Sequence, residues 1–194
     1  MKRVALLAAV VFLATSCAGT KLSSVWKNPD FHQSPRKIVV VSMVWDPKNR
    51  QRLDETFVRQ MKARGLDAVP GYTILPEPKL PEKAVVAARI KETGADTLLF
   101  GKLVDKESSL HYVQEPGHYN PDYHGTWSSY YDAGYPTAVE REYAIAEVKL
   151  YDVASEQLIW SAVSKTKMSN ATQDAIEAYV TRILDALKQD QVIP

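Results

Sequence analysis

The chain has 194 residues, of which 45% are hydrophobic and 24% are charged, a balance typical of a globular domain. Its 24 basic and 23 acidic residues are interspersed along the sequence. This argues against a nucleic-acid partner, because proteins of that class cluster a basic excess on one surface. The single cysteine, Cys17, has no second thiol to pair with, so a disulfide within the chain is excluded.

The first residues have the pattern of a secretory leader. Lys2 and Arg3 precede an uninterrupted apolar run that extends from Val4 to Ala14. This run is shorter than the roughly 20 apolar residues that a membrane-spanning helix needs. We therefore expect residues 1–16 to be a signal peptide that is removed.

The motif LATSC, which ends at Cys17, resembles the lipobox of bacterial lipoproteins, with Ala14 at the position usually held by a larger aliphatic residue. The resemblance implies cleavage before Cys17 and acylation of its thiol and new N-terminus. Two or three acyl chains hold a protein stably on a bilayer. Ala18 after the cysteine implies attachment to the outer membrane with the domain facing the periplasm. An ordinary exported protein cleaved near Ala18 is the alternative.

The mature chain divides into two parts. Residues 17–36 are rich in serine and proline and lack periodicity, which predicts a lipidated tether. Residues 37–194 are predicted to form a single periplasmic domain, long enough to bury a core without disulfides. Without Lys2 and Arg3 the chain has 22 basic and 23 acidic residues, a net charge of −1.

The first predicted elements of the domain follow clear signals. A β-branched run predicts a buried strand over residues 37–44. Asp46 followed by Pro47 predicts the start of a helix, which continues with apolar residues at every fourth position until Gly65. A second strand is expected over residues 66–72, where Pro70 and Gly71 favour an edge position or an early end.

The later elements are read from the same kinds of signal. Gly94 ends a predicted helix, alternating apolar residues predict a hairpin, and Asn170 with Gln173 resembles a capping box at the start of a final helix. The expected ranges are a helix over 81–93, strands over 97–104, 143–152 and 158–163, and the final helix after 170. The predicted fold is α/β, a mixed sheet of about five strands with three helices, in the order β-α-β-α-β-loop-β-β-α.

A long insertion over residues 111–137 separates the two halves of the predicted sheet. It holds six of the ten tyrosines, together with Trp127. Tyrosine and tryptophan bury large amphipathic surfaces at low entropic cost, so these side chains are candidates for binding a protein or stacking on sugar rings. The candidate partner-binding residues are Tyr119, Tyr123, Trp127, Tyr130, Tyr131 and Tyr135. The alternative is a loop that folds back over the sheet or extends the hairpin.

The insertion also contains the residues most suggestive of a metal site. His118, Asp122 and His124 are close in sequence, but their spacing matches no recognised zinc pattern and no fourth ligand is evident. We therefore expect neither a metal nor another cofactor.

No catalytic set is predicted. The only thiol is assigned to lipidation, and no serine lies in a nucleophile-elbow motif. The turn over residues 42–47 lacks the glycines of a phosphate-binding loop. Asp54-Glu55 and the acidic pair in residues 140–142 are interpreted as solvated faces without an acid-base role. The sequence favours a protein that is not an enzyme.

Three segments of the domain carry a family resemblance. KIVVVSMVWDPKNRQRLDETFVRQMKARGLDAVPGY, ETGADTLLFGKLV and EVKLYDVASEQLIWSAVSKT are similar to an uncharacterised family of bacterial outer-membrane lipoproteins with a domain of unknown function. The resemblance implies an envelope location and an α/β fold, and it transfers no catalytic residue. More distantly, the order of elements resembles the periplasmic domains of the curli-secretion lipoprotein and of penicillin-binding-protein activator lipoproteins, an analogy of fold alone.

These observations favour a membrane-anchored, non-enzymatic binding or assembly module of the cell envelope. The expected partners are the membrane, through acyl chains on Cys17, and an envelope protein or peptidoglycan. A cell-wall glycan or small-ligand binding protein is the alternative function. Self-assembly is also open, because an exposed edge of the predicted hairpin could pair with a second copy.

Overall fold

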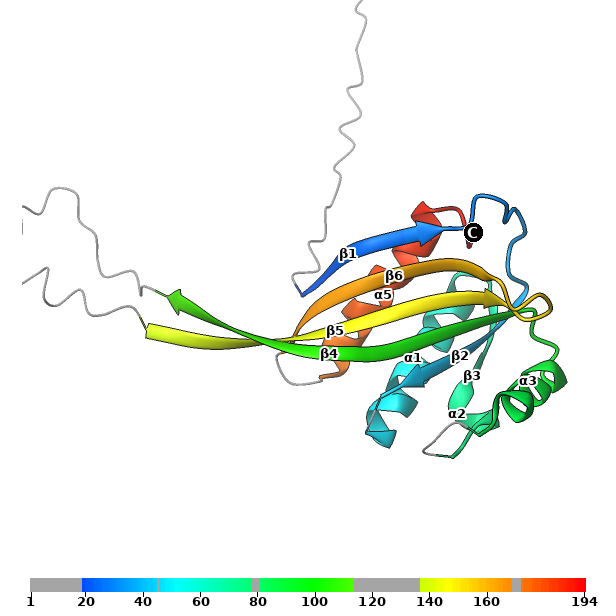
Figure 1. The fold of residues 1–194 in the computed structure, drawn as a ribbon, viewed down its shortest axis with the longest axis horizontal. Coiled ribbons are helices and arrows are strands. Elements are labelled where there is room, and N and C mark those ends of the chain that lie inside the picture. The colour runs from blue at the N-terminus through cyan, green and yellow to red at the C-terminus, as the bar shows by residue number, and fades with distance from the viewer. Residues whose placement is uncertain (1–18, 45, 78–80, 114–136, 169–171) are drawn as a thin grey trace, which may run out of the picture.

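The computed structural model describes residues 19–44, 46–77, 81–113, 137–168 and 172–194. One mixed sheet of six strands, in the order β1-β6-β5-β4-β2-β3, carries helices on both faces (Figure 1). The elements are β1 (Thr20–Lys27), β2 (Lys37–Met43), α1 (Pro47–Ala63), β3 (Asp67–Pro70), α2 (Gly71–Ile74), α3 (Lys83–Glu92), β4 (Thr97–Val113), β5 (Thr137–Asp152), β6 (Leu158–Met168) and α5 (Gln173–Gln189). The α/β prediction is confirmed, with β1 and the short α2 as additions.

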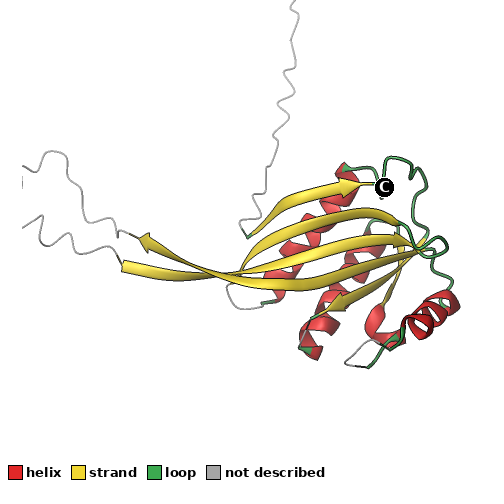
Figure 2. Ribbon diagram, viewed as in Figure 1, coloured by secondary structure: helices red, strands yellow, loops and turns green. Residues whose placement is uncertain are grey.

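The β-branched strand β2 lies between two parallel neighbours. It pairs with β3 on one side and with β4 on the other. Residues 38–41 are at most 1% exposed, as the sequence predicts for a strand covered on both faces. Because the chain leaves β2 through α1 to one neighbour and returns through α3 to the other, right-handed crossovers place these two helices on opposite faces of the sheet. Figure 2 shows this arrangement.

The core is divided by the sheet into two apolar clusters. Ile38 and Val40 belong to the larger cluster, between the sheet and helices α1 and α5. Val39 and Val41 point the other way and belong to the smaller cluster, under α3. Trp160 of β6 is fully buried in the larger cluster, where its indole Nε1 donates to Asp190 Oδ2 at 2.7 Å.

Side-chain caps mark the starts of the two longest helices, α1 and α5. Asp46 caps α1 by accepting the Lys48 N–H at 2.8 Å, and Pro47 begins the helix, as predicted. At α5 the cap is Thr172, whose hydroxyl accepts the Ala175 N–H at 3.3 Å. The predicted capping box began at Asn170, which lies outside the described residues. Thr172 takes the role because it directly precedes the first helical residue.

Strand β1 was not predicted, and it corrects the interpretation of residues 17–36 as a tether throughout. β1 pairs antiparallel with β6, with a change of register between Leu22 and Ser24. Leu22 packs against the core, and Lys27 Nζ donates to the Asp190 carbonyl at 2.7 Å. The irregular register breaks the alternation by which a strand is recognised in sequence. Part of the predicted tether is therefore an edge strand of the domain.

Strands β4 and β5 are longer than the sequence indicated. They stay paired from Thr97 and Asp152 to Val113 and Thr137. Beyond the last β5–β6 pair, Glu142 with Met168, residues 109–113 and 137–141 continue as a two-stranded ribbon that projects from the body (Figure 1). We call residues 106–113 and 137–144, this ribbon together with its base beside β6, the arm. The predicted strands ended at residue 104 and began at residue 143 because the polar run over residues 105–109 shows no apolar alternation.

Among the helices of the described segments, none is sufficiently long and apolar to cross a bilayer.

Candidate functional site

The arm determines where the aromatic insertion joins the domain. Val113 and Thr137 are the last pair of the β4–β5 ladder, so residues 114–136 start and finish at the arm tip. The predicted partner-binding side chains lie in that segment, outside the described residues, and their role stays a prediction. They are Tyr119, Tyr123, Trp127, Tyr130, Tyr131 and Tyr135, and His118, Asp122 and His124 lie in the same segment.

The predicted lipidation site precedes the first strand closely. Cys17 is outside the described residues, and its acylation stays a prediction. It is three residues before Thr20, where β1 begins.

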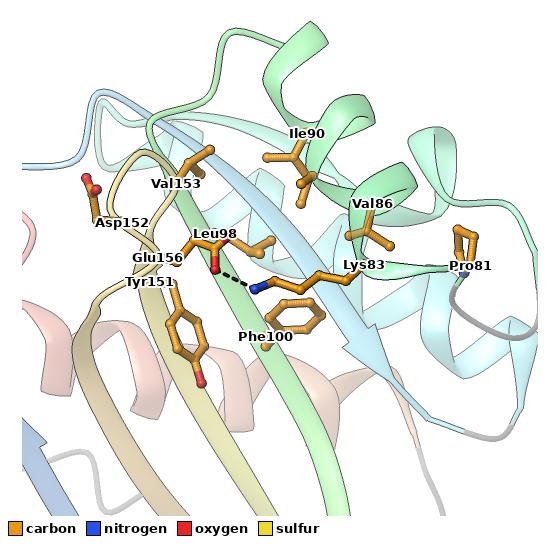
Figure 3. A pocket seen from close by; sticks show the side chains of 11 residues that line it. Pro81, Lys83, Val86, Ile90, Leu98, Phe100, Tyr151, Asp152, Val153 and Glu156 are labelled. Carbon is orange, nitrogen blue, oxygen red and sulfur yellow. Dashed lines mark hydrogen bonds and ion pairs between the residues drawn. The ribbon is translucent and has the colours of Figure 1, made fainter.

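An apolar cavity of about 460 Å³ lies between α3 and the sheet (Figure 3). Val86 and Ile90 enter it from α3, and Leu98 and Phe100 form its wall on β4. Phe100 also meets the Tyr151 ring edge-to-face, with 6.3 Å between the ring centroids. The complete lining is Pro81, Lys83, Val86, Ala87, Ile90, Leu98, Phe100, Tyr151, Asp152, Val153 and Glu156.

One ion pair lies beside this cavity. Lys83 Nζ contacts Glu156 Oε2 at 2.5 Å, connecting the first turn of α3 with the β5–β6 turn (Figure 3). This contact lowers the pKa of the Glu156 carboxyl below its ordinary value. Both side chains are largely exposed, so the pair contributes little to stability and opening it costs little.

The lining is mostly apolar, which suits an apolar ligand. Its volume lies within the range of small-molecule sites, which are mostly apolar with a few polar groups to orient the ligand. Two of its charged groups, Lys83 and Glu156, are paired with each other at the rim of the cavity. The sequence did not single it out, because Val86 and Ile90 looked like ordinary core positions of the helix predicted over residues 81–93.

A buried carboxylate lies where β2, α1 and α2 meet. Asp54 of α1 is 0% exposed. Its Oδ1 accepts the Ser42 N–H at 2.9 Å, and its Oδ2 accepts the Tyr72 N–H at 3.1 Å. Burial raises the Asp54 pKa to about 6, although the Ser42 hydroxyl, the two backbone N–H groups and the nearby Arg50 charge pull in the opposite direction.

The interpretation of Asp54-Glu55 as a solvated face is therefore wrong for Asp54, while Glu55 is exposed as predicted. Asp54 precedes Phe57 and Val58 by three and four residues, which places it on the buried face of α1. This spacing is the sequence signal that could have shown that Asp54 is buried. Because both carboxylate oxygens hold backbone N–H groups, Asp54 fastens the end of β2 to the start of α2, a structural role.

Close packing at the start of α2 supports this role. A Cβ atom on Gly71 would lie 2.4 Å from the Val40 carbonyl oxygen and 2.7 Å from Val41 Cγ2. Only glycine allows α2 to approach β2 this closely.

The other predicted carboxylates lie apart from the cavity. Glu140 and Glu142 are on the arm, where both are exposed, as expected for a solvated face. Within the described segments, no three His, Cys, Asp or Glu side chains are grouped so that they could hold a metal ion.

The fold is an α/β domain with helices on both faces of a mixed sheet, an apolar cavity under α3 and a projecting arm. No family model and no curated protein matches the sequence. The solved structures to which the fold shows distant similarity include the following two. One is the PelC dodecamer from Paraburkholderia phytofirmans, with 15% identity over 87% of this chain and 96% of the other and a TM-score of 0.48. The other is lipoprotein GNA1162 from Neisseria meningitidis, with 12% identity over 80% and 99% and a TM-score of 0.44.

Proposed function

We propose that this protein is a lipid-anchored, non-enzymatic binding module of the bacterial cell envelope, which presents the insertion at residues 114–136 to a partner. The leader and the LATSC motif ending at Cys17 support the anchor. The arm is the observation that carries the binding role, because it holds the attachment points of an aromatic-rich segment away from the body of the domain (Figure 1).

Stability of the domain does not account for the arm. Its eight residue pairs, of which the outer five are two-stranded, extend for about 24 Å at the usual rise of a β-strand. An isolated two-stranded ribbon is only marginally stable in water, so the arm depends on the six-stranded sheet from which it continues. A role in presenting the insertion explains why the chain forms an arm that exposes backbone and buries little apolar surface.

Replacement of residues 114–136 by an Asn-Gly turn tests this role. Val113 and Thr137 already pair, so a two-residue turn should close the ribbon without disturbing the sheet. We expect crosslinking in cells to capture a partner with the wild-type chain and to lose it with the shortened chain. Mass spectrometry of the mature N-terminus tests the anchor independently. Identical crosslinked partners for both chains would remove the insertion from the proposed function.

The cavity beside α3 favours a second candidate function, the binding of a small apolar ligand. Ala87→Trp should fill the cavity, whereas Ala88→Trp places the same side chain at an exposed position of α3. We expect an apolar fluorescent probe to bind the wild-type and Ala88→Trp proteins and to bind the Ala87→Trp protein weakly. Equal binding by all three would dismiss this candidate. Sedimentation with purified peptidoglycan tests the glycan alternative, which absence of co-sedimentation would dismiss.

A further inference from the structure

The end of the sheet from which the arm projects is also the end at which β1 begins. Thr20 of β1 pairs with Thr166, Thr166 pairs with Ala144, and Ala144 pairs with Lys106. These four residues form one row across strands β1, β6, β5 and β4. From this level β1 runs into the body, whereas β4 runs away from it along the arm (Figure 1).

The segment between Cys17 and β1 is short, which limits how far β1 could lie from a lipid on Cys17. Cys17 is three residues before Thr20, and three residues span at most about 11 Å when fully extended. If Cys17 carries the lipid, the start of β1 must therefore stay within that distance of the bilayer surface. The body extends from Thr20 to Lys27 and beyond, about 23 Å along β1 alone.

These lengths restrict how the domain can be oriented. An arm that pointed away from the bilayer would force the opposite end of the domain into the hydrocarbon, where its polar surface would lose hydration. The remaining orientations keep the arm directed toward the bilayer or along its surface. We infer that the arm lies against the headgroups of the membrane that holds the anchor, an interaction that rests on the proposed function.

The side chains at the base of the arm fit this partner. Lys21, Lys106 and Lys167 are exposed on three strands at this level, and no described carboxylate forms an ion pair with any of them. Lysines close to a surface are attracted to anionic headgroups. Of the carboxylates on this part of β4, Glu107 is paired with Lys165 at 2.8 Å and Asp105 accepts the Lys106 N–H, while the exposed Glu140 and Glu142 lie farther along the arm. Leu110, 65% exposed on the arm, adds an apolar contact.

Fluorescence quenching in vesicles tests the orientation. The mature lipoprotein is reconstituted into vesicles of phosphatidylethanolamine and phosphatidylglycerol with a headgroup-attached quencher. Ser108→Cys places a dye on the arm, and Ala154→Cys places it on the β5–β6 turn at the opposite end. Both positions are exposed, and acylation of Cys17 leaves the added thiol as the only one to label.

We expect the dye at position 108 to be quenched several times more strongly than the dye at position 154. A flexible insertion of about twenty Gly and Ser residues after Cys17 should bring the two values together, because it removes the length restriction. Substitution of Lys21, Lys106 and Lys167 by Gln should weaken quenching at position 108. Equal quenching at both positions in acylated protein would overturn this inference alone, whereas absence of acyl chains by mass spectrometry would overturn the anchor and the inference together.

Discussion

The buried Asp54 predicts an unusual dependence of stability on pH. Its pKa is about 6 in the folded protein and 3.8 in the ordinary, solvated state. The folded protein therefore binds a proton at this carboxyl more tightly than the unfolded chain does. The stabilising contribution of Asp54 is complete below pH 3.8 and is lost as the pH rises through 6. The difference of roughly two pKa units corresponds to about 3 kcal/mol in the free energy of unfolding.

Substitution of Asp54 isolates this effect from the titration of other carboxyl groups. In Asp54→Asn the side chain no longer titrates, and its NH2 group must face the N–H of Ser42 or of Tyr72, because each oxygen of Asp54 now accepts one of them. A mismatch between two buried donors costs about 1–3 kcal/mol. We expect the wild-type protein to be clearly more stable than the variant at pH 4, and most of this advantage to disappear by pH 7.

Urea denaturation of both proteins between pH 4 and pH 7 measures the difference directly. Glu55→Gln on the same helix is the matched control, since Gln51 and Tyr72 lower the pKa of the exposed Glu55 carboxyl. The contribution of Glu55 to stability should be lost as the pH falls, which is the opposite of the behaviour expected for Asp54. A difference between wild type and Asp54→Asn that is constant across the range, or that grows toward pH 7, would refute the reasoning for Asp54.

Three further substitutions test the packing. Gly71→Ala should destabilise the domain by about 2 kcal/mol in urea denaturation, because the new methyl group meets the Val40 carbonyl, whereas Gly101→Ala, with Ser42 Oγ at 4.0 Å, should change stability little. Trp160→Phe should cost about 2 kcal/mol through lost volume and an unpaired Asp190 carboxylate, and an unchanged melting temperature would contradict this. Thr172→Ala should cost about 1 kcal/mol by removing the α5 cap, and Thr172→Ser should restore it.

Sequence reasoning found the elements that bury one face or both faces in the core. The run at residues 38–41 predicted a strand covered on both sides, and the apolar stripe with Asp46 and Pro47 predicted α1. The arm escaped notice because the polar residues 105–109 show no apolar alternation. β1 escaped notice because the register change after Leu22 interrupts its alternation. In both cases backbone pairing with a distant strand forms the element, and local sequence does not report such pairing.

The candidate sites also divide into features that local sequence indicates and features that only the folded chain creates. The cavity beside α3 depends on the distance between a helix and the sheet, which no spacing of residues encodes. Asp54 was misinterpreted because an acidic pair in a helix usually faces solvent, yet its position relative to Phe57 assigned it to the core. Where periodicity and residue type disagree, as they do here, the polar residue is buried for a specific partner, in this case two backbone N–H groups.

Strand β1 changes what an anchor at Cys17 would do. Had residues 17–36 formed a flexible tether, its twenty residues would have separated the domain from the membrane by about 25 Å on average and left its orientation free. Instead β1 is held along its length by β6, by the Lys27 contact to the Asp190 carbonyl, and by the Asn28 N–H, which donates to the Ile159 carbonyl at 2.8 Å. Detaching β1 would break this entire ladder together. An acylated Cys17 would consequently fix the orientation of the domain as well as its location. The arm would then be held beside the membrane surface.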